Sequence, residues 1–343
     1  MICEKIVLHE DRNVNLTTYL HERSADEPKQ ARPAMVVLPG GGYSACADGE
    51  GEPVALAYLK EGFNCFVLRY TLRDKGGWPL PLNDYDEVFE LIERNAKEWN
   101  VDTNRVCVVG FSAGGHLAAC TATLAKHKPS VAVTVYPAIL PEVLALCQPG
   151  LPAPSEHVDR NTSPCFVVAA RDDGLVPIQN ALAFEKALAD NAIQFESHIY
   201  PQGGHGFSVG TQDIYGGAVC ERLPRWVADS VGFIRDMQGR QTVAGWTEPT
   251  LTPRLNDNEA DTLSVDCTLC YLRQFPEAET IIQPVVSGIQ LIADNMGAQS
   301  HILLAAFAAH TLRKVMAFLQ QPEEAAEKMD AALRTIPNRL IGK

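Results

Sequence analysis

The sequence predicts an α/β fold, in which helices flank a mostly parallel central sheet and an all-α C-terminal extension follows. Three observations support this fold class. Apolar runs of about five residues, bounded by Gly or Pro, alternate with amphipathic stretches as far as residue 237, and no strand pattern follows residue 239. Such runs are typical of strands buried on both faces of a parallel sheet, and their alternation with helices predicts parallel pairing. A chain of 343 residues can bury a core of this kind.

The predicted elements follow one another along the first 237 residues. We interpret 6–8 and 15–20 as a β-hairpin. Buried strands are predicted at 34–38, 64–68, 105–109, 131–135, 165–170 and 195–200. Helices are predicted at 84–99, after residue 115, at 178–190 and at 224–237. The stretch 138–162 is rich in Pro and breaks the pattern, so we interpret it as a surface excursion.

The change of pattern near residue 239 divides the chain. We predict an α/β domain over 1–238, a linker over 239–259 and a helical extension over 260–343. Within the extension, helices are expected at 260–272, 276–296, 298–320 and 322–336. The stretch 302–309 is apolar on nearly every side, so its helix should be buried against the α/β domain or a second subunit.

Charge and composition exclude several classes of function. The formal net charge is −13, with 29 Lys and Arg against 42 Asp and Glu, which argues against binding to nucleic acid or anionic membranes. No run of about 20 apolar residues could form a transmembrane helix. The N-terminus carries Glu4 and Lys5 and lacks the apolar stretch of a signal peptide. Ten scattered cysteines, several in apolar runs, indicate a reduced, cytoplasmic protein.

The strongest motif is Gly110-Phe111-Ser112-Ala113-Gly114, which follows a predicted strand and precedes a helix. Small residues at both ends allow the chain to turn sharply, which exposes the Ser112 hydroxyl in a strained conformation. This G-x-S-x-G pattern in this context predicts a nucleophilic serine. The alternative is a Gly/Ser turn in which Ser112 only caps the helix.

A nucleophilic serine needs a base and an orienting acid, which follow it along the chain in the order acid, then His. Asp172 and Asp173 both lie at the end of a predicted strand, and the one that is not the acid would cap or pair with Arg171. His205 lies in a Gly-rich loop after the next strand, which suits a catalytic base. The remaining histidines fit packed or solvated positions better, among them His116, His198, His301 and His310.

The loop Gly40-Gly41-Gly42 directly follows the strand predicted at 34–38. Its backbone N–H groups, with that of Ala113, could bind a developing oxyanion. A phosphate cradle is the alternative, but no Lys-Ser/Thr pair follows as in a Walker loop. The pair Cys267 and Cys270 lacks the further ligands of a zinc site, so we interpret it as two cysteines on one helical face.

Together these residues resemble the α/β-hydrolase superfamily. Within it they resemble the acetyl-xylan and feruloyl esterase-like bacterial esterases, which are related to hormone-sensitive lipase. The likeness covers about residues 4–237, and its matching stretches are 38–43, 101–118, 173–177 and 204–207. In such proteins the acid lies four residues before the Pro of a D-x-x-V-P turn, and Asp173 has that spacing from Pro177. Pro39 departs from the His of many relatives, and the tail after about residue 239 has no counterpart in the minimal family.

The resemblance implies an α/β-hydrolase fold and a catalytic triad of Ser112, His205 and Asp173, with Gly41, Gly42 and Ala113 around the oxyanion. It implies a serine carboxylesterase that removes small acyl groups, chiefly acetyl, from carbohydrates such as xylo-oligosaccharides, without a metal or organic cofactor. A peptidase or amide hydrolase with the same triad is one alternative, and a non-catalytic protein that acts through its helical tail is another.

The expected partner is a small-molecule or oligosaccharide ester, with no nucleic acid and no membrane. Three roles remain open for the tail: a lid over the site, an element that joins copies of the chain into a homo-oligomer, or an independent bundle.

Overall fold

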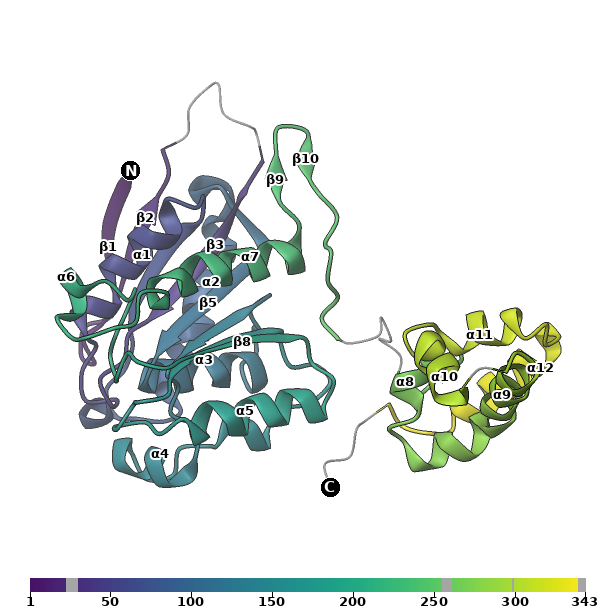
Figure 1. Ribbon diagram of the computed structural model, residues 1–343. Coiled ribbons are helices and arrows are strands. Elements are labelled where there is room, and N and C mark those ends of the chain that lie inside the picture. The colour runs from purple at the N-terminus through teal and green to yellow at the C-terminus, as the bar shows by residue number, and fades with distance from the viewer. Residues whose placement is uncertain (23–29, 255–260, 298, 339–343) are drawn as a thin grey trace. The chain divides into compact units, whose positions relative to one another are not determined.

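The computed structural model describes residues 1–22, 30–254, 261–297 and 299–338. The chain forms two compact units, one of residues 1–189 and 193–253, the other of residues 190–192 and 254–343 (Figure 1). The predicted linker overlaps the first unit, because Gln241–Thr242 (β9) and Gly245–Trp246 (β10) pair as short strands within it. The rest of that linker, from 255 to 259, lies outside the described residues. The predicted division at 238 and 260 stays a prediction.

The described part of the first unit contains an eight-stranded sheet with the order β1-β2-β4-β3-β5-β6-β7-β8. The predicted hairpin is present as β1 and β2; β1 pairs antiparallel with β2, and β2 with β4, whereas the remaining neighbours are parallel. The mostly parallel sheet is therefore confirmed. The strands are β1 Ile2–His9, β2 Val14–Leu20, β3 Arg32–Leu38, β4 Asn64–Arg69, β5 Val101–Phe111, β6 Ala132–Val135, β7 Cys165–Ala170 and β8 Phe195–Tyr200.

Helices cover both faces of this sheet (Figure 1). On one face, side chains of α2, α3 and α5 share one apolar core with Val36 and Val108; on the other, those of α1 and α7 share a second core with Val37 and Val109. Adjacent residues of one strand thus enter different cores, which is why the strands are continuously apolar. The helices of this unit are α1 Glu52–Leu59, α2 Leu80–Trp99, α3 Ala113–Thr123, α4 Pro141–Cys147, α5 Gln179–Asp190, α6 Gln212–Tyr215 and α7 Trp226–Gln238.

Three of these helices, α1, α4 and the short α6, were not predicted. The sequence of α1 has no amphipathic stripe, since apolar residues are distributed around it and its buried positions are only Val54, Ala55 and Tyr58. Helix α4 lies within the Pro-rich stretch 138–162, and its Pro141 occupies the first helical position, where the missing N–H costs nothing. Helix α3 begins at Ala113, directly after Ser112 and earlier than predicted.

The second unit is all-α in its described residues and has its own apolar core, which includes Leu272, Ile282 and Leu312. Its helices are α8 Leu269–Leu272, α9 Pro276–Asn295, α10 Ser300–Ala308, α11 Leu312–Phe318 and α12 Glu323–Leu333.

Two helix predictions in this unit were wrong. The helix expected at 260–272 is present only as α8, so Cys267 precedes the helix and does not share a helical face with Cys270. The helix expected at 298–320 is two helices, because the Thr311 side chain accepts a hydrogen bond from the Lys314 N–H and starts α11.

The expected burial of the stretch 302–309 against the α/β domain or a second subunit stays a prediction. Phe307 is buried, but Ile302 is 59% exposed, and the alanines at 305, 306 and 309 are exposed. The sequence of this stretch is apolar on every side because alanines occupy the outer positions of the helix. Exposure of such a small apolar side chain costs little free energy.

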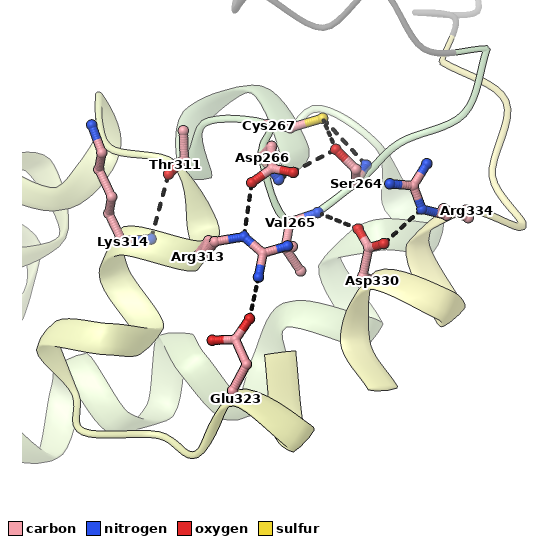
Figure 2. Close-up of polar contacts among 10 residues, drawn as sticks. All are labelled: Ser264, Val265, Asp266, Cys267, Thr311, Arg313, Lys314, Glu323, Asp330 and Arg334. Atoms are coloured by element: carbon pink, nitrogen blue, oxygen red, sulfur yellow. Dashed lines mark hydrogen bonds and ion pairs between the residues drawn. The ribbon is translucent and has the colours of Figure 1, made fainter. Parts of the chain in front are cut away.

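Polar contacts join the segments of the second unit (Figure 2). The Arg313 guanidinium lies between the carboxylates of Asp266 and Glu323. Asp330 accepts hydrogen bonds from the Val265 N–H at 3.0 Å and from Arg334 at 2.6 Å. These contacts connect the turn before α8 to α11 and α12. No helix in the described residues is long and apolar enough to span a membrane.

Candidate active site

Ser112 lies between the end of β5 and the start of α3, and its backbone has φ 53° and ψ −115°. A non-glycine residue rarely adopts this left-handed conformation, so the turn stores strain. The turn is possible because its ends are glycines. A Cβ on Gly110 would overlap the carbonyl oxygen of Gly114, and a Cβ on Gly114 would overlap that of Leu38. The strand, turn and helix are thus arranged as the motif predicts.

The structure brings Ser112, His205 and Asp173 together from three different loops. The His205 Nε2 lies 2.8 Å from the Ser112 Oγ, and the His205 Nδ1 lies 2.7 Å from the Asp173 Oδ2. An ionised carboxylate only accepts hydrogen bonds, so Nδ1 carries the ring proton and Nε2 is left to accept from the serine hydroxyl. The Asp173 side chain is 1% exposed and that of His205 is 17% exposed, which keeps this row of hydrogen bonds partly shielded from water.

Both aspartates of the pair contribute to this arrangement. The Asp173 Oδ1 accepts the N–H groups of Leu175 and Val176, each at 2.9 Å, which fixes the carboxylate in its turn. The Asp172 Oδ1 accepts the N–H groups of Gly203 and Gly204, each at 2.9 Å. Asp172 therefore has a structural role, as expected, but its partner is the backbone of the loop that carries His205 and not Arg171.

The predicted oxyanion residues lie next to Ser112. Gly41, Gly42 and Ser112 line one cavity of about 430 Å³. Among the described residues, no hydrogen bond occupies the N–H groups of Gly41 and Gly42, and Ala113, as the first residue of α3, has no partner for its N–H within the helix. The outer wall of the cavity is largely apolar and comes from α4 and the loop after Asp173: Val143, Leu146, Leu175 and Val176.

His116 is a packed histidine, as predicted. Its Nδ1 lies 2.7 Å from the Tyr43 hydroxyl and its Nε2 lies 2.8 Å from the Pro152 carbonyl oxygen. The carbonyl only accepts, so Nε2 carries the proton and Nδ1 accepts from Tyr43. Burial lowers the pKa of His116 to about 4, so the ring is neutral. His116 thereby joins α3 to the glycine loop and to the stretch that includes α4.

Glu50, Arg73 and Tyr136 lie near the site and were not predicted from the sequence. Glu50 and Arg73 line the cavity with Ser112, and the Tyr136 ring lies 4.9 Å from that of His205. None of them belongs to a motif with a chemical meaning. They meet Ser112 only through the fold, so no signal in a single sequence identifies them.

Two protein-family models match the chain. The model described as BD-FAE matches residues 22–136, and the dienelactone hydrolase family model matches residues 80–225. The chain is 34% identical to MGS-M1, an α/β hydrolase enzyme from a Medee basin deep-sea metagenome library. That crystal structure aligns with a TM-score of 0.65 and covers 69% of this chain and 98% of its own. This chain belongs to the α/β-hydrolase family.

Two further relatives of this α/β hydrolase have esterase names. The acetylxylan esterase of Xylanibacter ruminicola is 28% identical over 242 residues, which are 64% of this chain and 49% of the relative. The acetyl ester-xyloside bifunctional hydrolase of Caldicellulosiruptor lactoaceticus is 28% identical, with a TM-score of 0.56 over 66% of this chain and 88% of its own. The chain spans less than half the length of the first curated relatives that it matches.

Proposed function

We propose that this α/β hydrolase is a serine carboxylesterase that removes small acyl groups, chiefly acetyl, from carbohydrates such as xylo-oligosaccharides. The observation that carries the proposal is the continuous row of hydrogen bonds from Ser112 through His205 to Asp173. It lies beside backbone N–H groups of the glycine loop that have no hydrogen-bond partner in the described part of the chain.

The proposed reaction has two halves. In the first, the Ser112 Oγ attacks the ester carbonyl while the His205 Nε2 takes its proton, and Asp173 stabilises the imidazolium. The carbonyl oxygen becomes an oxyanion held by the N–H groups of Gly41, Gly42 and Ala113. His205 then protonates the leaving alcohol, which leaves an acyl-serine. In the second half, His205 activates a water that hydrolyses this acyl-enzyme and restores Ser112.

The substrate class rests on the relatives and on the cavity. One relative is named an acetylxylan esterase, and another is named an acetyl ester-xyloside bifunctional hydrolase. The cavity outside Ser112 is open and has apolar walls with few charges, which suits a neutral sugar ester better than a highly charged one. The net charge of −13 also disfavours polyanionic substrates.

Replacement of Ser112 by Ala tests the mechanism. We expect kcat with p-nitrophenyl acetate and with acetylated xylo-oligosaccharides to fall at least about 10⁴-fold, while Ser287→Ala, on α9 of the second unit, stays at the wild-type rate. A fluorophosphonate should label the wild type by forming a bond from the Ser112 Oγ to phosphorus as fluoride leaves. Undiminished turnover by Ser112→Ala would eliminate the mechanism.

Profiling of substrates separates the ester reaction from the alternative. Acyl esters of sugars and aminoacyl amides are compared at equal concentration by their kcat/KM values. The proposal expects sugar esters to be preferred, and a preference for amides would assign the chain to the amide hydrolases of this fold.

We also propose a cytoplasmic location and a homo-oligomer formed through the C-terminal helices. No disulfide is present among the described residues, and five of the ten cysteines are buried, which suits a reducing compartment. The exposed apolar side chains of the second unit, including Ile302 and Phe318, suit contact with another copy. Cell fractionation and a mass measurement in solution test these two proposals.

A further inference from the structure

A carboxylate other than that of Asp173, the carboxylate of Glu50, lines the cavity beside Ser112. It ends the short 3-10 helix Asp48–Glu50, is 6% exposed, and lines the cavity together with Ser112 and His205. Within the described residues no Lys or Arg lies at ion-pair distance from it. A buried carboxylate without a cation must be stabilised by hydrogen-bond donors.

The two oxygens of Glu50 accept from two different loops. The Oε2 accepts the N–H of Gly40 at 2.7 Å, and the Oε1 accepts the hydroxyl of Tyr136 at 2.6 Å. Gly40 immediately precedes Gly41 and Gly42, whose N–H groups are the proposed oxyanion donors. Since the direction of a peptide N–H depends on the path of the preceding residue, the bond to Gly40 helps to aim these donors.

The second oxygen reaches the loop of His205 through Tyr136. The Tyr136 hydroxyl donates to Glu50 and accepts the N–H of Ser208 at 3.0 Å, three residues after His205. The Tyr136 ring also packs against that of His205, with ring centres 4.9 Å apart. One carboxylate therefore connects the glycine loop to the loop of the base. It does not replace Asp173, because both ring nitrogens of His205 already have partners.

We propose that Glu50 is a positioning residue of the esterase, which holds the oxyanion donors and the His205 loop at a fixed separation around Ser112. The inference rests on the proposed function. A carboxylate suits this role because both of its partners are donors. A Gln amide has one acceptor oxygen, and its NH₂ group would face the other donor. An amide at this position would thus shift one of the two loops.

The carboxylate also has an electrostatic consequence for His205. Burial raises the pKa of Glu50, and its two hydrogen bonds and the neighbouring His205 offset only part of this rise. Among the residues that the structure describes, the titratable groups that face His205 are Asp173, Glu50 and Tyr136, with the Ser112 hydroxyl at Nε2. An ionised Glu50 would favour the imidazolium that forms when His205 takes the serine proton.

The test compares Glu50→Gln with Tyr136→Phe, which keeps the bond to Gly40 but removes the link to Ser208. Steady-state kinetics with p-nitrophenyl acetate, fluorophosphonate labelling and thermal unfolding are measured for both. Glu52→Gln, an exposed acid two residues further on, is the matched control. For Glu50→Gln we expect kcat and the labelling rate to fall about 10- to 100-fold, with KM changed less than about 3-fold. The pKa on the acid side of the kcat/KM profile should also fall.

The outcomes separate this inference from the proposed function. If Ser112→Ala abolishes turnover but Glu50→Gln is folded and keeps the wild-type kcat and pH profile, the positioning role is wrong and the esterase stands. If the wild type neither hydrolyses acyl esters nor reacts with fluorophosphonate, the proposed function fails, and the role of Glu50 fails with it. If Glu50→Gln does not fold, Tyr136→Phe decides: a lowered kcat at unchanged KM supports the link, and a wild-type kcat overturns it.

Discussion

Replacement of Asp173 by Asn is a sharp test of the row of hydrogen bonds from Ser112 through His205 to Asp173. The Asp173 Oδ1 accepts two backbone N–H groups, so the Asn carbonyl oxygen should occupy that position and keep both bonds. The Asn NH₂ group then faces His205 Nδ1, where the carboxylate Oδ2 was. An NH₂ group donates, so Nδ1 must accept, and the ring proton moves to Nε2. His205 in that tautomer cannot accept the Ser112 proton.

The expected size of the effect follows from this change of tautomer. Loss of the correct tautomer in a triad lowers kcat about 10⁴-fold, which corresponds to about 5 kcal/mol of transition-state stabilisation. The fold should survive, since the two backbone bonds are kept, so the melting temperature should change by only a few degrees. The assay is kcat with p-nitrophenyl acetate near neutral pH, with thermal unfolding of the same preparation.

Asp172→Asn is the matched control, since the neighbouring residue undergoes the same chemical change. The Asp172 Oδ1 accepts both of its N–H groups, and the Asn oxygen can take them over, so kcat should fall by less than about tenfold. A folded Asp173→Asn variant whose kcat lies within tenfold of the wild type would refute the assignment of Asp173 and the tautomer argument with it.

Three further predictions concern stability. The pKa of His116 is lowered to about 4, so the neutral ring stabilises the fold fully above the unfolded value near 6.5. About 3 kcal/mol should be lost as the pH falls from 6.5 to 4, and chemical denaturation of wild type and His116→Gln at both pH values should show a smaller loss in the variant. Gly114→Ala should not fold to an active protein, because its Cβ meets backbone, whereas Gly232→Ala, with open space on α7, should retain the wild-type melting temperature or raise it. Asp330→Ala should destabilise the second unit by about 1–2 kcal/mol, more than the exposed Glu323→Ala, and hydrogen exchange within that unit measures the difference (Figure 2).

The sheet could be predicted because its strands carry a strong local signal. Val36, Val37, Val108 and Val109 are buried on both faces, so the runs that contain them are apolar without alternation. The positions of Ser112 and His205 were also predictable, since sharp glycine turns after strands are encoded locally. The residues alone could not choose between Asp172 and Asp173, because both lie in one turn and their oxygens differ only in direction.

Most of the missed features depend on contacts that are distant in sequence. Helix α1 has no stripe of apolar residues, so its burial against the sheet leaves no periodic pattern. The break before α11 depends on the Thr311 cap, a short-range signal that an otherwise continuous apolar run conceals. The role of Glu50 depends on its contacts with Gly40 and Tyr136 and, through Tyr136, on Ser208. Ser208 lies 158 residues further along the chain than Glu50.

The neighbouring carboxylates of Asp172 and Asp173 each hold a different part of the loop that carries His205. The first holds the loop backbone where it leaves β8, and the second holds the imidazole at its tip. The ring therefore reaches the hydroxyl already oriented, and the entropy of that orientation is lost once, during folding, rather than in every turnover. A deletion within 171–177 would remove both of these attachments together, so the length of this turn constrains the chain as well as the identity of its acids.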